Sequence, residues 1–112
     1  MKLALRRSEY FEGDFDLQYR WYLGHAGVAL ADRFKDAVWT TFKLLAVHPE
    51  LGYLRNFRHP ALQDLRSFRV DPPFGVHLIF YRHNASELFV ERLMHGARHL
   101  PRRLVEPPRA SD

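Results

Sequence analysis

Hydrophobic residues recur at two different periods along the chain, and the change of period divides it into two halves. In residues 9–23 the aromatic and aliphatic side chains lie three or four positions apart, which places them on one face of a helix. Residues 28–47 repeat this spacing, and Pro49 ends it because proline disfavours helix at the preceding residue. A short turn bracketed by Gly24 and Gly27 joins the two helices, so we expect an antiparallel hairpin.

The second half of the chain alternates apolar and polar residues, which is typical of strands. Three such runs follow one another, at residues 65–70, 75–82 and 87–94, and a short alternating run at residues 2–7 predicts an N-terminal edge strand. The sequence Asp71-Pro72-Pro73 predicts a turn between the first two runs, since proline cannot donate to a sheet ladder.

This order of elements favours an α+β fold in a single domain. Its parts are an N-terminal strand, an antiparallel helix hairpin, a three-stranded antiparallel meander and a short C-terminal helical turn. The hairpin is expected to cover one face of the sheet, and the other face needs a partner or is solvated. We assign residues 1–104 to the domain and residues 105–112 to a C-terminal tail.

The charge of the chain is concentrated in its second half. Residues 1–54 carry seven basic and seven acidic side chains, whereas residues 55–112 carry ten arginines against six acidic residues. Arginine suits carboxylate or phosphate partners, although a solvated surface explains any single arginine equally well. The chain has no cysteine, no signal peptide and no apolar run long enough to cross a membrane, so we expect a cytoplasmic protein.

Few of the polar residues form a motif for catalysis or metal binding. His95 and His99 are four positions apart, but Gly96 and Pro101 disfavour the helix that would bring them together, so no metal site and no cofactor are expected. A nuclease would need a base, an acid and a cation near the phosphate. The residues on or at the ends of neighbouring strands that could converge for this purpose are Arg69, His77, Arg82, His95 and Arg98.

Two of these candidates, His77 and Arg98, have a structural alternative. Alternation places His77 on the same side as Ile79 and Tyr81, where it is expected to be a half-buried residue that fills space. Arg98 follows a glycine at a strand end, where a bend can aim a side chain at a partner or fix the turn by a local ion pair, and the two are equally consistent. Trp21 falls outside the aromatic stripe of its helix, which favours a protein interface.

Four segments resemble the RelE/ParE superfamily of type II toxins. They are FKLLAVHPELG at residues 42–52, LRSFRV at 65–70, HLIFYR at 77–82 and MHGARHLPRRL at 94–104. The last is similar to the ending of the ParE-like, plasmid-stabilisation branch, with His99 where aspartate is usual. The resemblance covers residues 3–104 and implies a small toxin that a cognate antitoxin wraps.

Two activities occur in this superfamily. RelE-like toxins cleave messenger RNA on the ribosome with basic residues and a C-terminal tyrosine, whereas ParE-like toxins poison DNA gyrase and are not nucleases. Here His77 stands where a catalytic arginine is expected, and Leu104 replaces the tyrosine. The resemblance therefore implies a ParE-like gyrase inhibitor without catalytic residues, without sequence-specific nucleic-acid binding and without a membrane association.

The residues expected to contact the antitoxin or the target are those of the arginine-rich half and the exposed tryptophan: Trp21, Arg69, Arg82, His95, Arg98, Arg102 and Arg103. Two alternatives stay open. One is a ribosome-dependent endoribonuclease that uses Arg69, His77 and Arg98, and the other is a non-toxic relic that only binds its antitoxin.

Overall fold

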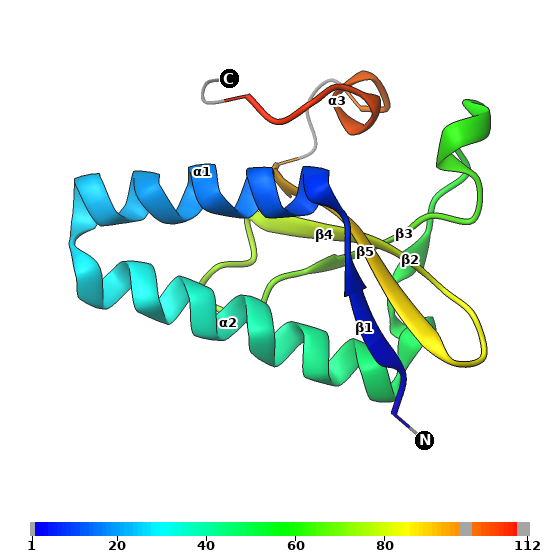
Figure 1. Cartoon of the computed structure of the whole chain (residues 1–112), viewed down its shortest axis with the longest axis horizontal. Coiled ribbons are helices and arrows are strands. Elements are labelled where there is room, and N and C mark those ends of the chain that lie inside the picture. The colour runs from blue at the N-terminus through cyan, green and yellow to red at the C-terminus, as the bar shows by residue number, and fades with distance from the viewer. Residues whose placement is uncertain (1, 97–99, 110–112) are drawn as a thin grey trace.

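A computed structural model describes residues 2–96 and 100–109 of the chain. Figure 1 shows two long helices lying side by side next to a sheet, with the C-terminal segment near the start of the first helix. The elements in chain order are β1 (Ala4–Arg7), α1 (Glu9–Ala26), α2 (Val28–Val47), β2 (Tyr53–Leu54), β3 (Arg66–Arg69), β4 (His77–His83), β5 (Glu87–His95) and α3 (Arg102–Val105), with 3-10 turns at Pro49–Leu51 and Pro60–Leu62.

The sheet has five strands in the order β1-β5-β4-β3-β2. The predicted antiparallel meander is confirmed as β3, β4 and β5, and the predicted N-terminal strand forms one edge. The sheet is larger than the predicted meander because β1 pairs with β5 in parallel and the two-residue β2 pairs with β3. Local alternation does not reveal a parallel pairing between strands about eighty residues apart in the chain, nor a strand of two residues.

The predicted helix hairpin is confirmed, with a tighter turn than expected. Ser8 caps α1, because its hydroxyl accepts a hydrogen bond from the Phe11 amide at 3.0 Å. Gly24 lies inside α1, and Gly27 alone makes the turn with a φ of 94°. Only glycine adopts this backbone conformation without strain, so one residue is enough to reverse the chain between α1 and α2.

The sheet is covered on both faces by the chain itself. Aromatic side chains of the helix hairpin pack on the first face, in a cluster that includes Phe11, Phe34 and Tyr81. A smaller cluster lies on the opposite face, where the turn at Pro60–Leu62 and helix α3 cover the sheet; its buried members are Leu62, Leu65, Phe80, Met94 and Leu104. The opposite face therefore depends less on a partner than the sequence suggested.

A buried ion pair joins the first helix to the last strand. Arg92 on β5 donates to both carboxylate oxygens of Asp14 on α1, at 2.8 and 2.9 Å, and the Leu93 amide donates to the same carboxylate at 3.0 Å. Both charged side chains are almost completely buried. The bidentate geometry satisfies the charges where water cannot reach them.

The same guanidinium also holds the C-terminal segment. Its Nη1 donates to the carbonyl oxygens of Arg103, Leu104 and Glu106, at 3.0, 2.9 and 2.6 Å. Pro108 then lies against α1 at Gly13, where a Cβ atom would come within 2.7 Å of the proline ring. The absence of a side chain at Gly13 therefore lets this segment lie directly on the helix.

We predict that Asp14→Ala lowers the free energy of unfolding by about 3 kcal/mol, because it leaves the Arg92 charge buried without its partner. The matched control is Asp16→Ala, which removes an exposed pair with Arg20 on the same helix and is expected to cost at most about 0.5 kcal/mol. Urea unfolding at neutral pH measures both values. Equal stability of the two variants would contradict the role given to the buried pair.

Candidate functional site

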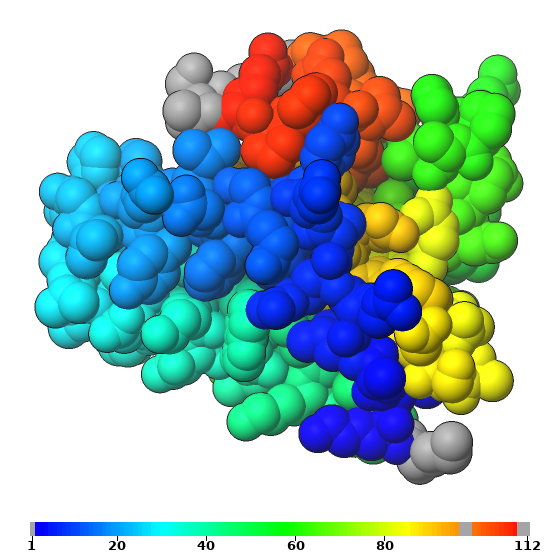
Figure 2. Space-filling view, in the orientation of Figure 1, coloured from blue at the N-terminus to red at the C-terminus, as the bar shows by residue number. Residues whose placement is uncertain are grey.

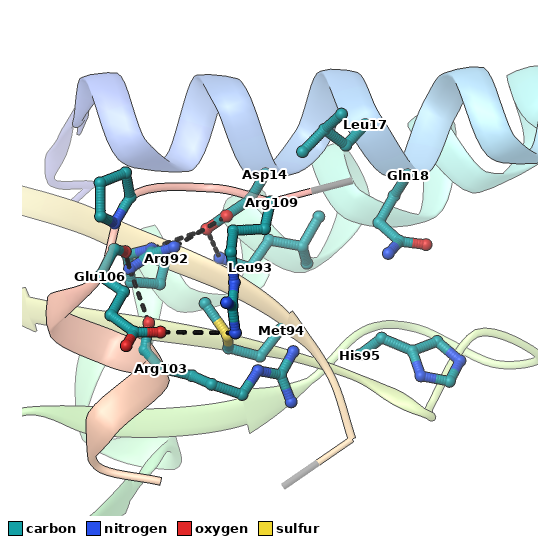
Figure 3. Close-up of a pocket in the computed structure, with 11 residues that line it drawn as sticks. Asp14, Leu17, Gln18, Arg92, Leu93, Met94, His95, Arg103, Glu106 and Arg109 are labelled. Carbon is teal, nitrogen blue, oxygen red and sulfur yellow. Dashed lines mark hydrogen bonds and ion pairs between the residues drawn. The ribbon is translucent and has the colours of Figure 1, made fainter. Parts of the chain in front are cut away.

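A polar cleft lies where α1, the end of β5 and the C-terminal segment meet. Figure 3 shows Asp14 and Gln18 reaching into it from α1, Arg92 and His95 from β5, and Arg103 from the C-terminal segment. Its volume is about 40 Å³, which is room for a few water molecules and far below the size of a ligand pocket. This cleft is too small to enclose a substrate.

Two of the predicted contact residues, His95 and Arg103, line this cleft. Arg102, on the same short helix as Arg103, is exposed and forms an ion pair with Glu106 at 3.1 Å. Arg98, which was expected beside them, lies outside the described residues. The structure therefore places His95 and Arg103 in one cleft, and their contact with a partner stays a prediction.

Arg82 has a structural role in addition to any contact with a partner. Its guanidinium donates to the backbone carbonyls of Gln63 and Ala61, at 2.8 and 2.5 Å, and to the carboxylate of Glu91 at 3.0 Å. These bonds anchor the 3-10 turn at Pro60–Leu62 onto the sheet. Arg82 lines a groove that is separate from the cleft of His95 and Arg103.

The nuclease candidates Arg69 and His77 lie on opposite faces of the sheet. Residues directly opposite each other on neighbouring strands share a face. Arg69 pairs with Leu78, whereas His77, one position earlier on β4, has its side chain on the face that the helices cover. Arg69 is exposed and donates to the carbonyl of Gly75 at 2.7 Å. The structure therefore does not bring these two residues together.

His77 is fully buried and held by aromatic neighbours. Its Nε2 is 2.8 Å from the Tyr22 hydroxyl, and its ring lies against Phe34. The prediction that it fills space beside Ile79 and Tyr81 is confirmed, with complete burial in place of half-burial. Burial, and then the neighbouring His95, lower the pKa of His77 from 6.5 to about 4. The imidazole is thus neutral at physiological pH.

Trp21 lies on the surface of the helix hairpin, near its turn. It is 53% exposed and stacks on His25, whose ring is 4.3 Å away, and Leu23 and Val28 are exposed in the same part of the hairpin. An indole that is packed on one side and open on the other is typical of a protein interface. Trp21 does not line the arginine-containing cleft, although the same helix, α1, contributes Asp14 and Gln18 to it.

The described residues contain no group of three or more histidines and carboxylates that could hold a metal ion. No helix in the described part of the chain is both long enough and apolar enough to span a bilayer.

The sequence of residues 5–100 matches the model of the ParE toxin of type II toxin–antitoxin systems of the parDE type. This chain belongs to the ParE toxin family. Among solved structures, its fold is similar to a chain of the chromosomal ParDE toxin–antitoxin system from P. aeruginosa, with a TM-score of 0.67 and 17% sequence identity. That match covers 86% of this chain and 98% of the other. No curated protein is similar enough in sequence to be matched.

Tyr81 holds the turn from Pro49 to Gly52, at the end of the segment 42–52 of this ParE-family chain. The Tyr81 hydroxyl donates to the carbonyl of Pro49 at 2.6 Å and accepts from the Gly52 amide at 2.8 Å. A Cβ atom at position 52 would collide with that hydroxyl, so glycine is needed there. Tyr81 thereby ties the turn after α2 to the centre of the sheet.

Sequence reasoning missed the residues that hold the cleft together. Neither Arg92 nor Asp14 was among the predicted site residues. The available signal was an acidic residue between two phenylalanines of an apolar helix face, at Phe11 and Phe15, since a charge there is buried and needs a partner.

We predict that the buried imidazole makes this ParE-family chain sensitive to acid. The folded-state pKa of His77 lies below the unfolded value of 6.5, so its contribution to stability is fully present above pH 6.5 and is lost as pH falls toward 4. The loss from this one group approaches roughly 3 kcal/mol. The measurement is urea unfolding at pH 7.5 and pH 4.5.

His77→Gln should flatten this pH dependence, whereas His48→Gln, at an exposed histidine, should leave it unchanged. The quantity compared is the difference in the free energy of unfolding between pH 7.5 and pH 4.5. This difference stays informative when a substitution changes the stability at both pH values. If the free energy of unfolding of His77→Gln falls between pH 7.5 and pH 4.5 as much as that of the wild type, other groups cause the acid sensitivity.

Proposed function

We propose that this ParE-family toxin acts in the cytoplasm by binding DNA gyrase, that it cleaves no nucleic acid itself, and that a cognate antitoxin neutralises it. The observation that carries the proposal is the separation of Arg69 and His77 onto opposite faces of the sheet, in a chain of the ParE toxin family. Without those two residues on one surface, the nuclease alternative loses its candidate site.

The chemistry of RNA cleavage also supports the proposal that this chain is not a nuclease. A general base must approach the 2′-hydroxyl to within about 3 Å. His77 has no exposed surface, and its Nε2 already contacts Tyr22. Its lowered pKa further makes it a weak base near neutral pH. For this imidazole to take a proton from a 2′-hydroxyl of RNA, the helix hairpin would have to leave the sheet.

The surface of the chain suits recognition of an acidic protein segment. Arg69 and Arg102 are exposed, and Arg103 lines the same cleft as His95. Guanidinium groups bind carboxylates in a bidentate way and remain charged at every physiological pH. The exposed Trp21 supplies an apolar contact on the helix hairpin, where a second part of a wrapping partner or the gyrase target would bind.

We predict that induction of this chain alone in bacterial cells stops DNA synthesis before it stops protein synthesis. The reason is that trapped gyrase blocks replication directly, whereas a ribosome-dependent nuclease would halt translation first. Pulse labelling with nucleotide and amino-acid precursors, in parallel cultures over the first minutes, measures the order.

The control variant is His77→Gln, provided that circular dichroism shows it to be folded. It should arrest DNA synthesis as the wild type does, because the imidazole makes no contact with solvent. An early loss of translation that His77→Gln abolishes would overturn the proposal in favour of the nuclease. Undisturbed growth with the wild-type chain would instead identify a non-toxic relic.

We predict that the complex with the antitoxin weakens as salt rises, because exposed arginines contribute to it through screened charges. The dissociation constant, measured by titration calorimetry between about 50 and 500 mM salt, should increase by at least about tenfold. A constant that is equal at both ends would exclude an acidic antitoxin segment on the arginines.

A further inference from the structure

The segment from β2 to β3 carries arginines whose charges no carboxylate of the described residues neutralises. Residues 53–69 contain Arg55, Arg58, Arg66 and Arg69 and a single acidic residue, Asp64. Most of the other arginines in the described chain form an ion pair with an aspartate or a glutamate, whereas these arginines form none within the part that the structure describes. The β2 side of the sheet is therefore a concentration of positive charge.

Two of these arginines, Arg55 and Arg69, lie on the face of the sheet opposite the helix hairpin. Ser67 is directly opposite Phe80, a member of the cluster on that face, so its side chain points the same way. Arg55 donates to the Ser67 hydroxyl at 3.1 Å, and Arg69 follows Ser67 by two positions on β3. Tyr53 pairs with Ser67 on β2 and shares this face with them.

Aromatic rings hold the Arg55 guanidinium in place. Its Cζ atom lies 5.3 Å from the ring centroid of Phe57, 5.8 Å from that of Phe80 and 5.9 Å from that of Tyr53. A guanidinium that is already fixed on rings loses little freedom when it binds a ligand. Within the described chain it forms one hydrogen bond, to Ser67, so most of its N–H groups are available. Tyr53 is 73% exposed and offers its ring beside this charge.

Arg58 extends the basic surface beyond the sheet, and its side chain is exposed. Figure 2 shows the chain around residue 60, in bright green, on the side of the molecule away from the turn of the helix hairpin, in cyan. Trp21 is exposed near that turn. A protein that binds the Trp21 surface therefore leaves room for a second ligand at Arg55 and Arg58.

The side chains of this surface are of the kinds that bind the backbone of a nucleic acid. Guanidinium groups bind phosphates in a bidentate way, and an exposed aromatic ring beside them stacks on a base. The ring and the arginines together favour DNA over an acidic peptide, because a base accompanies every phosphate. Gyrase, the proposed target, holds DNA, so a chain bound to gyrase meets phosphates at a high local concentration.

We propose that Tyr53, Arg55 and Arg58 bind the backbone of the DNA that gyrase holds. The proposal rests on the proposed function. Arg69, on the same face, adds to the positive potential there. Contacts with phosphates carry no sequence information, so the surface accepts any DNA sequence. The complex of gyrase with DNA is then a better target than free gyrase, because it offers contacts on two sides of the toxin.

The chain offers a matched pair of double variants for the test. Arg55→Gln with Arg58→Gln removes two charges from the proposed surface. The control, Arg20→Gln with Arg33→Gln, removes two exposed charges from the helix hairpin and changes the net charge equally. Arg58→Gln alone is added because Arg58 is exposed, whereas Arg55 packs on three rings. Thermal unfolding of each variant checks that the fold is retained.

The first measurement is the affinity of the full-length chain for a short labelled DNA duplex, by fluorescence anisotropy at several salt concentrations. The wild type is expected to bind with a dissociation constant of about 1–100 μM near physiological salt. The logarithm of the association constant falls linearly with that of the salt concentration, and the double variant should lower this slope by about 2. Arg58→Gln should lower it by about 1, and the control should keep the wild-type slope.

The second measurement is the amount of DNA broken by purified gyrase at increasing concentrations of the toxin. The variant with Arg55→Gln and Arg58→Gln should need at least about fivefold more toxin than the control for the same amount of broken DNA. The reason is that it keeps the contact with gyrase and loses the contact with DNA.

The results that would overturn the inference are distinguishable from a failure of the proposed function. A salt slope that is unchanged in the double variant, or lowered equally in the control, would show that this surface does not bind DNA. A single-stranded RNA bound at least about tenfold more tightly than the duplex would favour RNA as the ligand. If both double variants break DNA with gyrase equally well, the surface is not used there, while the proposed function stands. If the wild type causes no breakage with gyrase, the proposed function fails, and the contact with gyrase-held DNA fails with it.

Discussion

The arrangement of this molecule depends on one buried guanidinium. Arg92 binds the carboxylate of Asp14 on α1 with two donors and three carbonyl oxygens of the C-terminal segment with a third nitrogen. An arginine in a dry environment is tolerated only when its donors are satisfied, so these partners cannot move independently. The helix hairpin, the last strand and helix α3 are thereby held in one geometry, and the cleft lined by His95 and Arg103 results from it.

The aromatic core determines which side chains remain available for function. Phe34 and Tyr22 enclose His77 between the hairpin and the sheet, where burial keeps the imidazole neutral. His77, the histidine of the nuclease alternative, is thus part of the core. What reaches the surface is a set of arginines and apolar side chains, which are groups that recognise a protein partner by charge and shape.

The sheet presents two different edges to the solvent. Strand β2 is only two residues long, and short edges resist pairing with other chains. Strand β1 is longer, and an apolar groove lined by Leu3, Trp39 and Phe42 lies between it and α2.

Local periodicity is enough to predict the helix hairpin, the meander of β3, β4 and β5, and the inward direction of His77. The folded arrangement fixes the parallel pairing of β1 with β5, the partner of Arg92 and the separation of Arg69 from His77. These features join residues far apart in the chain. Their energies come from burial and from long-range pairing, which leave no period in the local sequence.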